Sequence, residues 1–244
     1  MNKTAENQSR SVQDSVYTAL RAGIINLNLA PGTIISEKEI SSRFKVSRTP
    51  VREAFIHLSN EGLLRVIPQR ETQVSLVDFA RVTQEFFLRE SLETAVLEPF
   101  INRCGKALFN ELERLIEMQS LALEKNALIE FIEYDDRFHR MFFEVGEELL
   151  SWEVLERMSG HYHRVRLLTV RIKGVADNIP DQHRKILAAL RKKDLPKARA
   201  LLGNHLHKLD TEEPMLRKEF PGYFAVPPTE NPFEVDFGGL PRLA

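Results

Sequence analysis

The sequence predicts a mainly α-helical protein in two parts: three short helices with a small β-hairpin, then an all-α bundle of six or seven helices. Three observations predict it. Two short helical patterns lie close together between residues 36 and 64. A segment of alternating apolar and polar residues follows them, and from residue 78 onward apolar residues recur at helical spacing. The predicted boundaries are residues 10–76, residues 78–213, and a tail of residues 214–244 that is rich in Pro, Gly and Phe.

The first predicted helix has apolar side chains at every fourth position. They are Val12, Val16, Leu20 and Ile24. The pattern stops before the LAPG sequence at residues 29–32, because proline and glycine interrupt a helix. A second helix is predicted to begin after Ser36, whose hydroxyl can cap it, and Glu39 three residues later completes a capping box. Ile40 and Phe44 are expected to form the buried side of this second helix.

A third helix is predicted after a short turn. We expect Thr49 as its N-cap and Pro50 at its first position, where the missing N–H of proline costs no hydrogen bond. Apolar residues at i, i+3, i+4 and i+7 spacing predict its buried side. They are Val51, Ala54, Phe55 and Leu58.

Cations gather where this third helix begins. Arg48 and Arg52 flank its start and Lys38 lies at the start of the preceding helix, so positive side chains crowd an end that the helix dipole already makes positive. This arrangement favours a bound anion. DNA phosphates supply one, and the planar fork of arginine can also read guanine in the major groove. Two helices with a few arginines also form solvated faces in many proteins, so this pair alone leaves both interpretations open.

The segment LLRVIPQRETQVSL alternates around a turn at residues 68–71, which predicts a β-hairpin. The motifs LAPGTIISEKEIS, VSRTPVREAF, EGLL and PQRETQV resemble the winged helix-turn-helix of the GntR family of bacterial transcription regulators. By this resemblance the operator contacts are Lys38, Arg48, Thr49 and Arg52, with Gln69 and Arg70 at the wing. Glu71 stands where the family usually has glycine, and its carboxylate should weaken close approach to a minor groove.

Composition and charge suit such a protein. The 244-residue chain is 43% hydrophobic and 28% charged, enough for two modest cores. Residues 1–76 carry ten Lys/Arg against seven Asp/Glu and the remainder 24 against 28, which favours a few placed contacts over non-specific coating of nucleic acid. Cys104 alone forms no intrachain disulfide, and no apolar run approaches the ~20 residues of a membrane span. We therefore expect a cytoplasmic protein without a membrane segment.

Helical spacing continues over six segments after the hairpin, and no further strand is predicted. They are residues 78–104, 107–124, 127–146, 150–172, 180–192 and 194–210. From about Pro214 the prolines argue against helix and the aromatic residues argue against pure disorder. A loose terminus and an arm that packs on a partner subunit both remain open for the tail.

Four residues of the bundle are candidate metal ligands. Asp135 and His139 are four residues apart, so on a helix both side chains leave the same face one turn apart. His183 and His205 have apolar neighbours that point them toward the bundle interior. One carboxylate and three imidazoles suit a transition metal with positions left open for a ligand. A surface ion pair and hydrogen-bonded core histidines are the alternative interpretation.

A second resemblance favours the metal. The motifs DxxFH and QHRKILAALRKKDLPKARALLGNHL resemble the FCD domain, the C-terminal ligand-binding domain of the FadR-type branch of the GntR family, and the resemblance covers most of residues 80–210. It implies a divalent metal, most often zinc or nickel, held by Asp135, His139, His183 and His205. It also implies a small carboxylate effector, such as a sugar acid or a hydroxy acid, that binds the metal and nearby arginines.

The candidate arginines for the effector are Arg89, Arg164 and Arg166, because a buried arginine pairs well with an anionic fork. His161 and His163 are expected to add hydrogen bonds. The alternative for Arg89 is an ion pair with Glu93 on the same helix.

Three classes of function compete. A metal-dependent enzyme could use the same four ligands, but no general base stands at a fixed spacing from them, and the DNA-binding part would be superfluous. A bundle that only dimerises, or binds an acyl chain without a metal, leaves the four ligands unexplained. We therefore predict a metabolite-responsive transcription regulator. Its bundle is expected to form a homodimer that places two winged domains on a palindromic DNA operator.

Overall fold

The computed structural model describes residues 3–67, 71–207 and 209–226, and its order of elements confirms the predicted fold class. The N-terminal part contains α1 (Lys3–Ile25), β1 (Ile34–Ile35), α2 (Glu37–Phe44), α3 (Arg48–Asn60), β2 (Leu64–Ile67) and β3 (Glu71–Val74). The bundle contains α4 (Phe79–Arg103), α5 (Lys106–Glu124), α6 (Leu128–Gly146), α7 (Leu149–Met158), α8 (Gly160–Arg171), α9 (Ile179–Arg191), α10 (Leu195–Leu206) and α11 (Leu209–Glu219). Each part has its own cluster of buried apolar side chains.

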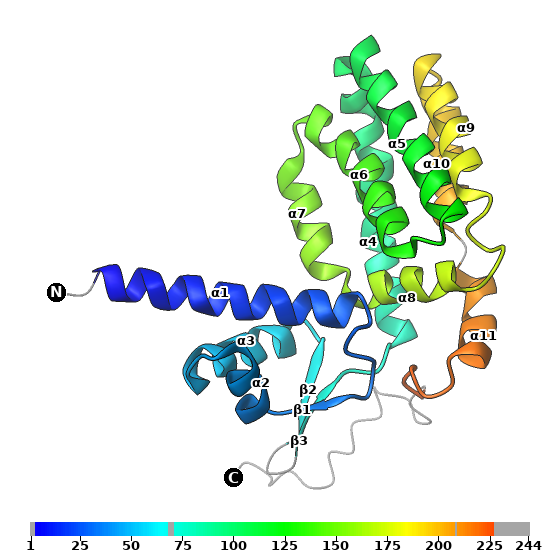
Figure 1. Cartoon of the computed structure of the whole chain (residues 1–244). Helices are drawn as coiled ribbons and strands as arrows, with labels where there is room; N and C mark the ends of the chain where they lie inside the picture. Colours follow the sequence, from blue (N-terminus) through cyan, green and yellow to red (C-terminus); the bar gives the residue numbers. More distant parts are fainter. Residues whose placement is uncertain (1–2, 68–70, 208, 227–244) are drawn as a thin grey trace, which may run out of the picture.

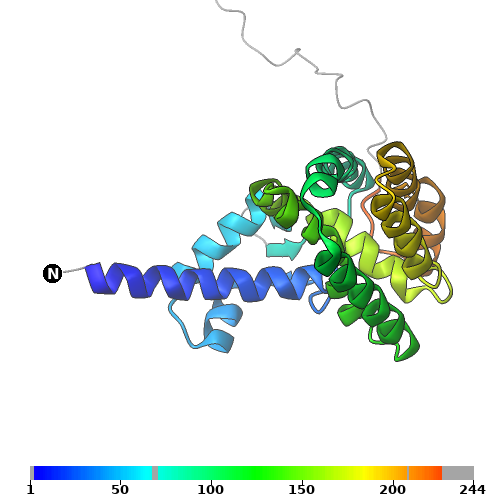
Figure 2. The same ribbon diagram turned by 90° about the horizontal axis from the view of Figure 1, so that it is seen from above.

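The core of the N-terminal part forms from the helical stripes that the sequence predicts. Val16, Leu20 and Ile24 of α1 are buried, and so are all four predicted residues of α3. The prediction that Phe44 is buried is wrong, because its side chain remains 37% exposed, as does that of Val12 in α1. α1 also begins at Lys3, well before the predicted start of the first domain. Figure 1 shows α1 lying along α2, α3 and the sheet, and Figure 2 shows it projecting away from the bundle.

The two predicted helix starts have different outcomes. Ser36 caps α2 as expected, and its hydroxyl accepts a hydrogen bond of 3.1 Å from the backbone N–H of Glu39. The N-cap of α3, however, is Ser47 and not Thr49, and its side chain makes no capping hydrogen bond. Pro50 is therefore the third residue of α3 rather than the first. It still costs no hydrogen bond, because the first four N–H groups of a helix lack an intrahelical partner.

The sheet has three antiparallel strands in the order β1-β3-β2. β2 and β3 form the predicted hairpin, in register from Leu64 opposite Val74 to Ile67 opposite Glu71. β1 was not predicted, because a two-residue strand is too short to show an alternating pattern. The predicted wing residues Gln69 and Arg70 lie outside the described residues.

Two predicted boundaries in the bundle are wrong. The segment expected as one helix over residues 150–172 forms two helices, α7 and α8, with Ser159 in a non-helical conformation between them. A Cβ on the next residue, Gly160, would lie 2.7 Å from a methyl group of Leu63, so glycine allows α8 to start against the winged domain. α11 also continues through Pro214 to Glu219, although its proline argued against helix.

The described part of the tail packs on its own chain. The backbone of Val77 exchanges hydrogen bonds of 2.8 Å with Tyr223 and Ala225. Phe224 is buried and stacks on Phe79 with ring centroids 5.0 Å apart. The described residues of the predicted tail, 214–226, are therefore packed and are not a loose terminus. Residues 227–244 lie outside the described residues.

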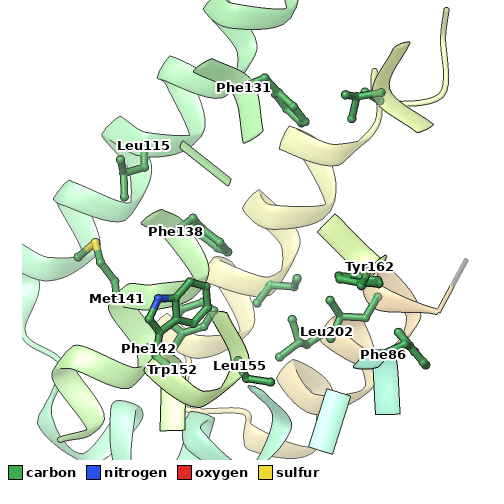
Figure 3. Close-up of a cluster of buried hydrophobic side chains, with 14 of the residues drawn as sticks. Phe86, Leu115, Phe131, Phe138, Met141, Phe142, Trp152, Leu155, Tyr162 and Leu202 are labelled. Carbon is green, nitrogen blue, oxygen red and sulfur yellow. The ribbon is translucent and has the colours of Figure 1, made fainter. Parts of the chain in front are cut away.

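The bundle core surrounds the short helix α8. Figure 1 shows α8 crossing beneath α5, α6, α9 and α10 and across the lower part of α4, close to the C-terminal end of α1. Figure 3 shows the aromatic core, in which Phe131, Phe138 and Phe142 of α6 point inward and Tyr162 of α8 lies beyond them. α8 thus lies between the bundle and the winged domain. Among the described residues, no helix has the length and apolar character that a membrane crossing requires.

Candidate metal centre and DNA-binding surface

The four predicted metal ligands converge in the bundle interior. Each offers one ligand atom, and these atoms all lie within 4.8 Å of one another. The ligands come from three helices, since α6 carries Asp135 and His139, α9 carries His183, and α10 carries His205. His183 Nε2 lies 3.5 Å from Asp135 Oδ1 and 3.1 Å from His205 Nε2. We call these four residues the metal cluster.

Each imidazole of the metal cluster has a partner at its other ring nitrogen. His183 Nδ1 lies 2.7 Å from Gln119 Oε1, and His205 Nδ1 lies 2.8 Å from Gln182 Oε1. His139 Nδ1 lies 2.6 Å from Glu93 Oε2, an ion-pair contact that departs from straight hydrogen-bond geometry. An acceptor at Nδ1 favours the tautomer with a lone pair on Nε2, which is the form that binds a metal. The sequence analysis did not predict Gln119, Gln182 or this role for Glu93.

The electrostatics of the cluster suit a divalent cation. Burial lowers the pKa of His183 to about 3, even though Asp135 opposes this shift, so at neutral pH its imidazole is uncharged. Burial raises the pKa of Asp135, but Arg166 and the nearby histidines outweigh it and the net shift is downward. His139 Nε2 is buried without a hydrogen-bond partner among the described residues. A metal ion would satisfy that nitrogen, and three imidazoles with one carboxylate fit such an ion.

A small cavity of about 60 Å³ lies beside the metal cluster. We call it the effector cavity. Its polar lining comes from Arg89, Asp135, Tyr162, Arg166, Thr169, His205 and Glu212. A water needs roughly 10–15 Å³ on the same measure, so the space corresponds to about four to six waters, which suits a small polar ligand and not a long acyl chain.

Two of the three predicted arginines line the effector cavity. Arg166 donates from Nη1 to Asp136 at 2.6 Å and from Nη2 to Asp135, so both ends of its fork are occupied. Arg89 donates from Nε to Glu93 at 2.5 Å, the ion pair that the sequence left open as an alternative. Within the described part of the chain, the two Nη atoms of Arg89 form no hydrogen bond. Arg89 therefore pairs with Glu93 through Nε, and its two Nη atoms can still donate hydrogen bonds to an anion.

The other predicted effector residues, Arg164, His163 and His161, do not line the cavity. Arg164 is completely buried, and its guanidinium donates to the carbonyl oxygens of Ser75 at 2.6 Å and Gly160 at 3.2 Å. It therefore joins α8 to the winged domain. His163 lines a separate cavity between the bundle and α1, and its Nδ1 lies 3.9 Å from Asp136. The helical pattern marked Arg164 and His163 as inward but did not show which neighbour each one meets.

His161 and Glu85 extend this junction. His161 Nδ1 accepts a hydrogen bond of 3.0 Å from the backbone of Asp78, and its Nε2 lies 3.2 Å from the carbonyl oxygen of Gly62. Glu85 of α4 accepts hydrogen bonds from the backbone N–H groups of His161 and Tyr162, at the start of α8. α8 thus contacts the winged domain with its first turn and lines the effector cavity with its later residues.

The predicted DNA contacts lie on one exposed part of the winged domain. Arg48, Thr49 and Arg52 are in the first turns of α3, Lys38 is in the first turn of α2, and all four side chains are exposed. Arg52 forms a surface ion pair with Glu37 at 3.2 Å. The arginines thus flank the N-terminal end of α3, where a phosphate or a base edge can approach.

A winged helix-turn-helix with exposed cations, joined to a helical bundle with an internal cavity, defines the class of DNA-binding transcription regulators. The chain belongs to the GntR family: residues 12–74 match "Bacterial regulatory proteins, gntR family" and residues 85–208 match the FCD domain. It is a DNA-binding regulator and not an enzyme.

Relatives and solved structures agree with this assignment. The chain is 32% identical over 223 residues to the HTH-type transcriptional repressor RspR of Escherichia coli, across 91% of this chain and 98% of that protein. It is 26% identical over 194 residues to the gluconate operon transcriptional repressor of Bacillus subtilis, across 78% of each chain. The solved structure of E. coli McbR/YncC has the same fold, with a TM-score of 0.70, 20% identity, and coverage of 85% of this chain and 98% of that chain.

Proposed function

We propose that this regulator senses a small carboxylate through a divalent metal bound by Asp135, His139, His183 and His205. The observation that carries the proposal is that two residues of the metal cluster, Asp135 and His205, line a small cavity that Arg89 also lines. A bound zinc or nickel ion would supply positive charge for the effector carboxylate. The Nη edge of Arg89 would hold the second oxygen, since a guanidinium fork matches a carboxylate.

The size and charge of the effector cavity select the ligand class. Its volume of about 60 Å³ favours a hydroxy acid or a short sugar acid over an acyl chain. Asp135 and Asp136 already neutralise Arg166, so we expect Arg89 rather than Arg166 to bind the carboxylate. The gluconate operon repressor named above gives D-gluconate as one ligand to test.

We further propose that the protein acts in the cytoplasm as a homodimeric repressor at a palindromic operator. RspR and the gluconate operon regulator are both named repressors. A two-fold dimer places two recognition helices one helical turn of DNA apart, which a palindrome matches. Lys38, Arg48, Thr49 and Arg52 would make the contacts from each subunit, together with Gln69 and Arg70 of the wing.

Calorimetric titration of D-gluconate and lactate into metal-loaded protein tests the sensor. We expect one of the two ligands to bind the wild type, and His183→Ala and Arg89→Ala each to weaken that binding at least tenfold. Arg48→Ala is the control, because this residue lies in the winged domain and should leave effector affinity unchanged. Equal affinity in His183→Ala and the wild type would remove the metal from the sensor. Wild-type protein that takes up no stoichiometric zinc or nickel would reject the metal site itself.

A further inference from the structure

Glu93 occupies a position between the metal cluster and the effector cavity. It lies on α4 with a completely buried side chain. Its Oε1 accepts from Arg89 Nε at 2.5 Å, and its Oε2 lies 2.6 Å from His139 Nδ1. One buried carboxylate therefore contacts a proposed metal ligand on α6 and the proposed effector-binding arginine on its own helix.

Each of the two contacts fixes a group that needs orientation. A carboxylate at Nδ1 of His139 favours the tautomer whose Nε2 faces Asp135, and such partners strengthen a histidine as a metal ligand. The contact at Nε of Arg89 fixes one side of the guanidinium, and Arg89 also lines the effector cavity. The guanidinium carbon also lies 5.3 Å from the centre of the Tyr162 ring, which restricts the plane of the fork.

We infer that Glu93 is a positioning residue that couples metal binding to effector binding, because its two oxygens hold His139 and Arg89 at the same time. This inference rests on the proposed metal-dependent sensor. Glu93 would contact neither the metal nor the effector. It acts on the metal through His139 and on the effector through Arg89. A change in the position of either side chain therefore alters the contact of the carboxylate with the other.

Glutamine and aspartate separate the two contacts. In Glu93→Gln the single amide oxygen can accept from His139 or from Arg89 but not from both, and the amide N–H₂ then faces a donor. Glu93→Asp keeps the charge but is one methylene shorter, so it too should lose one contact. Glu98→Gln is a matched control, since Glu98 lies on the same helix and pairs at 3.0 Å with Arg199 of α10, away from the metal cluster.

The experiment titrates Co²⁺ into the full-length protein and follows its visible absorption, which reports the ligand set. We expect Glu93→Gln and Glu93→Asp to weaken Co²⁺ binding about 10- to 100-fold, as other outer partners of metal ligands do. Glu98→Gln should bind like the wild type. Circular dichroism checks that each variant is folded.

A double-mutant cycle tests the coupling itself. Arg89→Gln should change the Co²⁺ dissociation constant through Glu93, so its effect in the wild type and in Glu93→Gln should differ by about twofold or more. A purely structural role for Glu93 would lower stability and leave the two effects multiplicative. Multiplicative effects, or wild-type Co²⁺ affinity in Glu93→Gln, would overturn the inference while the proposed sensor stands. A wild type that binds no Co²⁺ would overturn both.

Discussion

Arg164 of α8 donates a hydrogen bond of 2.6 Å from Nη1 to the backbone carbonyl oxygen of Ser75, the residue directly after strand β3. The Ser75 hydroxyl in turn donates a hydrogen bond of 2.6 Å to the carbonyl oxygen of Gly62, which lies two residues after the end of α3. Tyr162 and Arg166 on the same short helix line the effector cavity. α8 therefore contacts the winged domain and lines the effector cavity, and we propose that it transmits a change in the cavity to the winged domain. A ligand shifts such an arrangement only by binding two states with different affinity.

Replacing Arg164 should uncouple the two domains. Arg164→Met keeps most of the buried volume but leaves Ser75 without its donor, which should cost about 1–3 kcal/mol of stability. Effector affinity should be unchanged, because Arg164 does not line the effector cavity. The effect of the effector on operator affinity should shrink. Fluorescence anisotropy with an operator fragment selected in vitro measures this. If the effector still shifts operator affinity as in the wild type, α8 does not carry the coupling through this contact.

Removing an arginine at the start of α3 should weaken operator binding without unfolding the protein. We expect Arg48→Ala and Arg52→Ala each to cost about 1–3 kcal/mol of binding free energy. Folding should persist, because both side chains are exposed and the Arg52 pair with Glu37 is a surface ion pair of small value. Arg114→Ala on α5 is the control, since this arginine also forms an exposed ion pair but lies in the bundle. If both variants shift operator DNA in a gel at the same protein concentration as the wild type, α3 is not the helix that contacts the operator.

Helical spacing together with the resemblance to the FCD domain predicted that the residues of the metal cluster meet, but not what surrounds them. Asp135 and His139 share a helix face, so their spacing alone brought them together. Gln119 and Gln182 are fixed by packing between helices, and nothing in their local sequence distinguishes them from other polar residues. The DNA-contact residues followed from the order of motifs. Whether they contact an operator remains a prediction.

The errors in the sequence analysis have a common physical cause. The division at Ser159 depends on the close approach of Gly160 to Leu63, which is a contact between distant parts of the chain. The direction of Arg164 depends on Ser75 in the same way. Local periodicity indicates that a side chain points inward, but only the packed fold decides which neighbour it meets.

Acid should destabilise the protein through His161. Burial and the nearby Arg164 lower the pKa of His161 from its ordinary 6.5 to about 3. The unfolded chain therefore binds a proton below pH 6.5 that the folded chain excludes until about pH 3, so this stabilisation is complete above pH 6.5 and is lost as the pH falls. At pH 5 the loss is about 2 kcal/mol.

Thermal unfolding of metal-free protein between pH 7.5 and pH 5 measures this dependence. Burial lowers the pKa values of His163 and His183 as well, to about 4 and about 3, so they add to the slope. His161→Gln should make the slope shallower, because glutamine does not bind a proton in the unfolded chain and only His163 and His183 then contribute. His57→Gln is the control, since His57 is exposed on α3. A slope in His161→Gln equal to that of the wild type would show that His161 does not contribute.

A methyl group at Gly160 should strain the junction between the two domains. Its Cβ would lie 2.7 Å from Cδ2 of Leu63, whose side chain is completely buried in the core of the winged domain and would have to shift. We expect Gly160→Ala to lose about 1–3 kcal/mol of stability through overpacking, partly offset by up to about 1 kcal/mol of helix propensity. Gly105→Ala is the matched control, because it precedes α5 and a Cβ there would meet no atom within 4 Å. Urea unfolding compares the two variants with the wild type.

The same strain should also weaken the response of operator binding to the effector. Leu63 follows Gly62, whose carbonyl oxygen accepts a hydrogen bond from the Ser75 hydroxyl and lies 3.2 Å from His161 Nε2. Equal stability of Gly160→Ala and Gly105→Ala would mean that the winged domain and α8 can separate freely at this contact, which would remove the structural basis for coupling through α8.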